Sequence, residues 1–93
     1  MDRENKALQI ILNSTEPPQA SLFLDGRLLA IGTPTLDTSG RLLVFSPNDQ
    51  TLLDTVYPEA TMIVEGMGGE SISVTNLRQC STGSRHWHME IVV

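Results

Sequence analysis

Residues 20–45 have the sequence ASLFLDGRLLAIGTPTLDTSGRLLVF, in which two apolar runs meet at Asp25-Gly26 and a third follows residues 37–40. An Asp-Gly pair suits a two-residue hairpin turn, because both central residues of that turn need positive φ. The tetrapeptide DTSG at 37–40 has aspartate first and glycine fourth, as a type I turn prefers. The stretch therefore predicts three consecutive antiparallel strands.

The first predicted hairpin is apolar on both faces. With the turn placed at Asp-Gly, Leu22 lies opposite Leu29, and these two share one face with Ile31. Phe23 and Leu28 share the other face. Such a hairpin needs two covers, and we expect a barrel interior on one side and an N-terminal helix on the other. If the Phe23 face is left uncovered, a homodimer is expected, since exposed apolar strand surface usually marks an interface.

Residues 46–57 are expected to leave the sheet as a short helix. Ser46 is a candidate N-cap, Pro47 suits the first helical position, and Asp49 suits the first turn. The helix must end before Pro58. Its buried side would consist of Leu52, Leu53 and Val56.

Three further strands are predicted, at residues 61–65, 70–75 and 85–92. The middle one alternates, with Ile72 and Val74 on the inward face. Residues 32–34, Gly-Thr-Pro, interrupt the second strand and suggest a bend or bulge at a barrel corner. Six strands separated by turn signals favour a small antiparallel barrel over alternating strands and helices.

The N-terminal segment allows two interpretations. Within residues 2–13, the apolar positions are spaced as on one side of an amphipathic helix, and a strand over Leu8 to Leu12 is the alternative. Pro17 and Pro18 end either element. The predicted fold is mainly β: one domain over residues 1–93, with an N-terminal α-helix in 1–14, a six-stranded antiparallel split β-barrel in 20–93 and one short internal helix.

Composition narrows the class of protein. The chain has 93 residues, 40% of them apolar and 18% charged, which is ordinary for a globular domain. A net charge of -5 repels phosphate backbones, so nucleic acid is an unfavoured partner. No apolar run approaches the roughly 20 residues that cross a bilayer. The single Cys80 cannot form an internal disulfide, which indicates a reducing, cytoplasmic location.

Candidate chemistry is sparse. His86, His88 and Glu90 would share one face of a strand, but neighbours two residues apart stand roughly 7 Å apart, which suits a polar outer face better than a zinc site. No nucleophile-elbow pattern is present, so the chain is expected to be neither an enzyme nor a holder of a cofactor or metal. Arginines remain as possible anion ligands. The candidate phosphate-binding residues are Arg27, Asp37, Ser39 and Arg41.

The chain resembles the small barrels of cyclic-di-GMP signalling: the PilZ domain and the PilZ-like N-terminal domain of bacterial flagellar brake proteins. The residues that carry the resemblance are LQIIL at 8–12, ASLFLDGR at 20–27 and LDTSGRLLV at 36–44, followed by the three later strands. PilZ receptors have an Arg-x-x-x-Arg pair and an Asp-x-Ser-x-x-Gly motif. Here the paired arginines are missing, and Leu42 stands where the glycine is expected, which makes direct cyclic-di-GMP binding doubtful.

The resemblance implies a non-enzymatic regulatory or protein-interaction module in bacterial signalling, close to the flagellar brake N-terminal domain. A small-molecule receptor for a cyclic dinucleotide is the alternative. A second resemblance is to the Sm-like RNA-binding barrel, whose first motif is similar to Leu22-x-Leu24-Asp-Gly26 followed by Asp37. Its second motif needs an arginine near Glu65, and the strand predicted at 85–92 is surplus to that fold.

Overall fold

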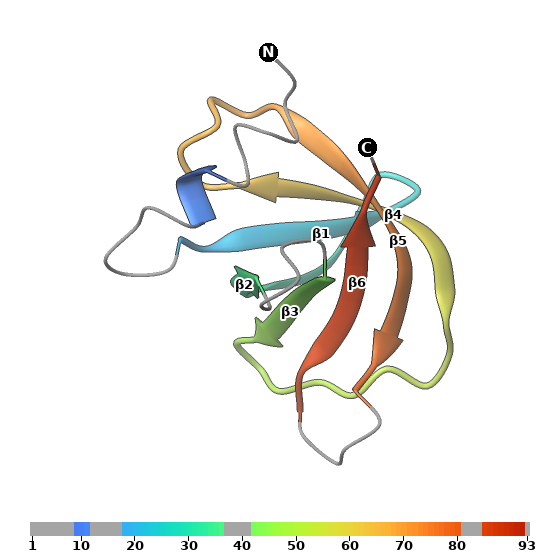
Figure 1. Cartoon of the computed structure of the whole chain (residues 1–93). Coiled ribbons are helices and arrows are strands. Elements are labelled where there is room, and N and C mark those ends of the chain that lie inside the picture. Colours follow the sequence, from blue (N-terminus) through green and yellow to red (C-terminus); the bar gives the residue numbers. More distant parts are fainter. Residues whose placement is uncertain (1–8, 12–17, 37–41, 81–84, 93) are drawn as a thin grey trace.

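The computed structural model describes residues 9–11, 18–36, 42–80 and 85–92 (Figure 1). Its strands are β1 (Ala20–Leu24), β2 (Arg27–Leu36), β3 (Leu42–Pro47), β4 (Tyr57–Val64), β5 (Ser71–Gln79) and β6 (Trp87–Ile91). All neighbouring pairs are antiparallel, and the order β1-β2-β3-β6-β5-β4 closes where β4 pairs with β1. The predicted mainly β, six-stranded antiparallel barrel is confirmed, in a closed rather than a split form.

Period-two alternation directs the core side chains of the strands into the barrel. In β6, Trp87, Met89 and Ile91 point inward, as their sequence spacing predicts. The Trp87 ring lies 5.5 Å from that of Phe45 on the neighbouring β3, within the range of a favourable aromatic pair. With few aromatic residues in the chain, the rest of the core is aliphatic, and its largest fully buried members include Leu22, Leu43, Met62, Met67, Ile72, Leu77 and Met89.

The β1–β2 hairpin has the predicted turn but not the predicted register. Asp25 and Gly26 have φ of 50° and 80°, which confirms the turn with two positive φ angles. Beyond it, a β-bulge makes Leu29 an extra residue, so that Leu22 pairs with Ala30. The expected face shared by Leu22, Leu29 and Ile31 is therefore wrong. After the bulge the small Ala30 faces the core, and Ile31 turns outward with 44% of its surface exposed.

No break occurs at residues 32–34, because β2 continues through them to Leu36. Gly32 permits a close approach of β2 to its neighbour β3. A Cβ atom at this position would lie 2.8 Å from the Phe45 ring and from the Pro47 Cα, and closer still to the Ser46 carbonyl oxygen. Pro34 is buried opposite Phe45. The glycine thus marks a close approach of two backbones rather than the end of a strand.

The predicted helix at residues 46–57 is wrong. Ser46 and Pro47 complete β3 instead, paired with Thr33 and Gly32. Residues 48–56 then form a turn and an irregular connection to β4. Side chains of β5 and β6 hold this connection: Gln79 accepts a 2.8 Å hydrogen bond from the Leu53 N–H, and the Trp87 indole donates one of 2.9 Å to the Thr51 carbonyl.

Residues 9–11 form a single helical turn within the predicted N-terminal helix. The rest of that prediction, residues 1–8 and 12–14, lies outside the described residues. Ile11 belongs to the core cluster, and Ile10 lies beside Gly66 in the β4–β5 turn, so this helical turn packs at that end of the barrel (Figure 1). In the described part of the chain, no helix has the length and apolar composition needed to cross a membrane.

Candidate interaction face of the barrel

Of the four predicted phosphate ligands, the structure describes only Arg27. Arg27 is the first residue of this ten-residue strand, and its exposed side chain makes no hydrogen bond or ion pair with any described residue. The strand extends roughly 30 Å from Arg27 to Leu36, at about 3.3 Å per residue. Asp37, Ser39 and Arg41 lie outside the described residues, so the four-residue set stays a prediction.

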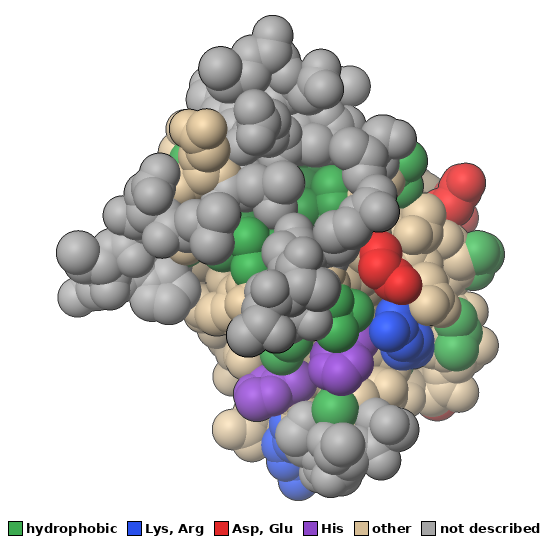
Figure 2. Space-filling model, viewed as in Figure 1, with side chains coloured by type: hydrophobic (Ala, Val, Ile, Leu, Met, Phe, Trp, Pro, Cys, Tyr) green, Lys and Arg blue, Asp and Glu red, His purple; other side chains and the backbone are tan. Residues whose placement is uncertain are grey.

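The histidines of β6 and the segment before it lie on the outside of the barrel, where Figure 2 shows histidine side chains grouped over β6. His88 pairs with Arg78 of β5 on one side and with Val44 of β3 on the other. Among the residues that the structure describes, no three His, Cys, Asp or Glu side chains are close enough to hold a metal ion.

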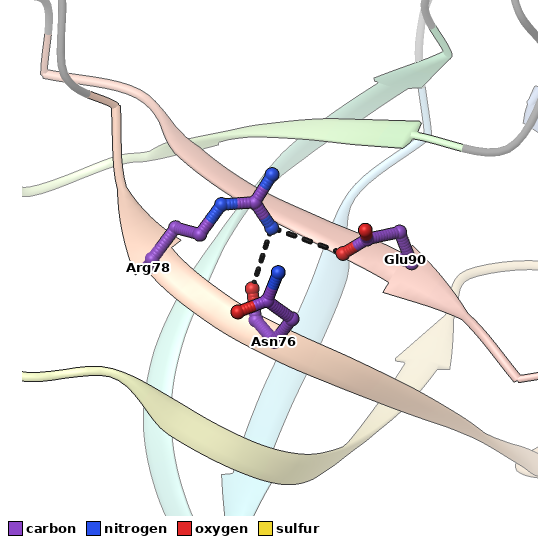
Figure 3. A network of polar contacts seen from close by, with 3 residues as sticks. All are labelled: Asn76, Arg78 and Glu90. Atoms are coloured by element: carbon purple, nitrogen blue, oxygen red, sulfur yellow. Dashed lines mark hydrogen bonds and ion pairs between the residues drawn. The ribbon is translucent and has the colours of Figure 1, made fainter.

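Beside them, Arg78 joins β5 to β6 (Figure 3). Its Nη1 donates a 2.7 Å hydrogen bond to the Asn76 carbonyl and a 3.0 Å hydrogen bond to Glu90 Oε2. Asn76 has a positive φ of 55° and lies in a bulge between Thr75 and Arg78. The guanidinium is thus bound to one backbone carbonyl and one carboxylate of its own chain, and this network holds the bulge in place.

A different face carries two of the exposed apolar side chains, Leu28 and Ile31. On the outside of β2, β1 and β4, the pairing aligns Leu28, Phe23 and Thr61 in one row. A second row, displaced along the strands, consists of Ile31, Ser21 and Ile63. These six residues, here called the outer face, include no charged side chain. Leu28 protrudes most, with 55% of its surface exposed.

The row that contains Phe23 continues beyond Thr61 into a groove. Thr61 pairs with Ser73 of β5, whose carbonyl accepts a 3.1 Å hydrogen bond from the Val92 N–H. The groove has a volume of about 350 Å³. Its lining includes small hydroxyl side chains, Thr61 and Ser73, together with the larger Phe23 and Val92. The outer face therefore has a protruding leucine on the β2 side of β1 and a groove on the β4 side.

Charged residues occur at the hairpin end of this face. Asp25 and Glu59 line the groove, whereas Arg27 pairs with Leu24 and so alternates to the side of the hairpin away from Leu28. The side chains of all three are exposed, and within the described ranges none has a hydrogen-bond or ion-pair partner. At the opposite end of the face, the side-chain amide of Gln19, the residue before β1, donates a 2.8 Å hydrogen bond to the Thr33 hydroxyl of β2. The three charges are thus available to an external partner.

Sequence reasoning identified the Phe23 and Leu28 face but missed the groove and the contribution of β4. The alternation in 70–75 was recognised, with Ile72 and Val74 inward, but it was not interpreted as an outer surface with little side-chain volume. No known protein family model, curated protein or solved structure matches the chain. Function must therefore be argued from the face itself.

Proposed function

We propose that the chain is a non-enzymatic protein-interaction module that binds a protein surface through the outer face of β2, β1 and β4. The observation that carries this proposal is the exposure of Leu28 and Ile31 in two rows without charged side chains. Clustered apolar surface of this kind is costly to leave in water and typical of interfaces. The closed barrel offers a rigid support, since every strand is paired on both sides.

The module is proposed to act in bacterial signalling, in the manner of the PilZ-like barrels that the sequence resembles. Their interaction domains lack the arginine pair of the nucleotide receptors, as this chain does. A cytoplasmic location fits a chain with a single cysteine, Cys80, which is buried.

Site-specific photo-crosslinking tests the proposed function. Benzoylphenylalanine replaces Leu28 in cells that produce the chain, and a matched control replaces Leu52, which is 58% exposed on the β3–β4 connection. We expect a discrete protein adduct, identified by mass spectrometry, from position 28 and not from position 52. The adduct should disappear when Phe23→Asp is added to a chain that remains folded by circular dichroism. Equal labelling at both positions, or none at position 28, would refute the proposal.

A cyclic-dinucleotide receptor is the competing proposal. The observation that favours it is the Arg27 guanidinium, which makes no ion pair or hydrogen bond with any described residue and is available to a phosphate, whereas that of Arg78 is bound to Glu90. Titration with cyclic-di-GMP, followed by amide NMR, decides between the two. The receptor proposal requires saturable shifts at Arg27 that Arg27→Ala abolishes. The interaction proposal expects no saturable shift at millimolar nucleotide.

A further inference from the structure

We infer that residues 49–56 of the β3–β4 connection, here called the strap, open and close over one end of the barrel as a unit, with the Trp87 side chain as their latch. This movement lies at the barrel end and does not depend on the proposed function, which uses the outer face. Side chains of β5, β6 and the segment before β6 hold the strap, whereas backbone pairing closes the barrel itself. The strap can therefore move while the barrel stays intact.

The strap crosses the end of the barrel at which β6 begins and β5 ends. At this end β3 neighbours β6 through the pair Phe45–Trp87, and β5 neighbours β4 through the pair Leu77–Tyr57. Because β3 and β4 are not adjacent in the barrel, the chain between them runs past the ends of β6 and β5 (Figure 1). The strap thus lies over the part of the core that contains Trp87.

Two side chains of the barrel bind the middle of the strap. The Trp87 indole donates its 2.9 Å hydrogen bond to the Thr51 carbonyl, and Gln79 accepts the 2.8 Å hydrogen bond from the Leu53 N–H. On the barrel side, each of these bonds ends on a side chain and not on the backbone ladder. Both can therefore break without separating any pair of strands.

The strap contributes little to the core. Leu53 is half-buried and packs against the core cluster, and the other seven residues of the strap are exposed. Leu52 and Val56 are 58% and 56% exposed although they are apolar. Segments with few buried apolar contacts are the first to open in native proteins. We therefore expect the strap to open at a lower free energy than the barrel unfolds.

A strained residue marks the point where the strap leaves β3. Gln50 has a φ of 58°, a left-handed conformation that residues other than glycine adopt at a cost. Its N–H bonds to the Pro47 carbonyl, and its own carbonyl accepts a 3.4 Å hydrogen bond from Arg85. The closed strap holds this conformation, and opening releases it. Gln50 is thus the expected hinge.

Opening changes the surface at this end of the barrel. In the closed state the Trp87 ring is fully buried. When Thr51 moves away, the Nε1 edge of the ring loses its hydrogen bond and meets water. When Leu53 withdraws, the core atoms beneath it become accessible. The open state therefore has a larger apolar surface than the closed state.

Native-state hydrogen exchange of the full chain, followed by NMR at low urea, tests the inference. The reporters are the Leu53 amide and the Trp87 indole Nε1–H. We expect their protection factors to agree within about threefold and to lie at least about tenfold below those of amides in β1 and β5. Their exchange should depend only weakly on urea, because opening exposes much less surface than unfolding does.

Gln79→Met tests whether the strap moves as a unit. The change removes the acceptor of the Leu53 N–H and leaves the bond between Trp87 and Thr51 in place. It should nevertheless accelerate exchange of both reporters about fivefold. Gln50→Val should also accelerate both, because a β-branched side chain strains the left-handed conformation of the closed strap further.

The control is Ile72→Val, which makes a small cavity in the core near the opposite end of β5. Since Ile72 stays buried when the strap opens, this variant should accelerate the β1 and β5 amides about threefold or more and leave both reporters unchanged. A Trp87 indole proton that exchanges no faster than the barrel amides overturns the inference. So does an Ile72→Val variant that accelerates reporters and barrel amides equally, or a folded Gln79→Met variant that accelerates Leu53 alone.

Discussion

The Trp87 indole, buried in the barrel, donates its only polar hydrogen to the backbone carbonyl of Thr51 at 2.9 Å. Thr51 belongs to the irregular connection between β3 and β4, which has no regular backbone ladder of its own. The Trp87 side chain, which fills part of the barrel core, therefore also positions the β3–β4 connection. This contact helps to hold a segment with helix-start signals in its irregular path.

Trp87→Phe is expected to destabilise the chain by about 2 kcal/mol. The change removes indole volume from the core and leaves the Thr51 carbonyl without its donor. Urea unfolding measures the loss, and amide exchange at Leu53 should become faster. Leu52→Ala, an exposed position on the same connection, should change stability by less than about 0.5 kcal/mol. Equal losses in the two variants would contradict this role of Trp87.

The pKa of Asp49 is expected to depend on the side chain of Thr51. Hydrogen bonds from the Thr51 hydroxyl, and then from the Thr51 backbone N–H at 3.1 Å, hold the pKa of Asp49 below its ordinary value. Thr51→Val should raise that pKa only part of the way, because the N–H remains. NMR titration of the carboxyl group measures the change. Thr55→Val is the control. If it raised the pKa of Asp49 by the same amount as Thr51→Val, the effect could not be assigned to the Thr51 hydroxyl.

The sign of the pH effect follows from the lowered pKa. A carboxylate whose pKa is lower in the folded state stabilises the fold above its unfolded pKa, and the contribution disappears as pH falls through the folded value. The contribution of Asp49 is thus present at neutral pH and lost in the acid region, below about pH 4. Asp49→Asn should remove this part of the pH dependence of unfolding.

Gly32→Ala is expected to destabilise the barrel strongly, by about 3 kcal/mol or more, because the new Cβ meets backbone atoms of Ser46 and Pro47 that cannot rotate away. Gly68→Ala separates this effect from backbone strain. Gly68 has a φ of +72° with open space around it, so its loss should be about 1–2 kcal/mol. Chemical unfolding of both variants provides the comparison. If Gly32→Ala destabilises the chain no more than Gly68→Ala, then β2 and β3 can move apart at Gly32 and the close approach is not a strict requirement.

Local chemistry was enough to predict six strands, although β4 begins four residues before the predicted 61–65 and β5 ends four residues beyond the predicted 70–75. The Asp25-Gly26 turn follows from the positive φ that both positions adopt, and the inward set of β6 follows from alternation around Trp87. Neither prediction depends on a distant part of the chain. The same holds for Ile72 and Val74, which are buried as their spacing indicates.

The errors arose where distant contacts override local preference. The bulge at Leu29 places the small Ala30, and not Leu29, opposite Leu22 inside the closed barrel. Pro47 was assigned to a helix, but its pairing with Gly32 keeps it in β3. The outer face was predictable only in part for the same reason. Its β4 residues, among them Thr61 and others that line the groove, lie beside β1 only because the barrel closes.

At the Arg78 network, the contribution of charge to stability can be measured separately from that of backbone conformation. The side chains of Arg78 and Glu90 are 29% and 42% exposed, so Glu90→Gln should cost less than about 1 kcal/mol. Asn76→Ala should cost more, about 1–2 kcal/mol, because Asn76 has a positive φ that alanine adopts poorly. Asn76→Gly should be nearly neutral.

Salt distinguishes the two contributions to this network. In about 1 M NaCl the cost of Glu90→Gln should shrink, since salt screens exposed ion pairs. The cost of Asn76→Ala should not change, because it comes from backbone sterics. Thermal unfolding at low and high salt measures both variants. A salt-independent cost of Glu90→Gln would show that the geometry of its hydrogen bond to Arg78, and not its charge, supports the bulge. A salt-dependent cost of Asn76→Ala would show that the bulge is held mainly by the ion pair.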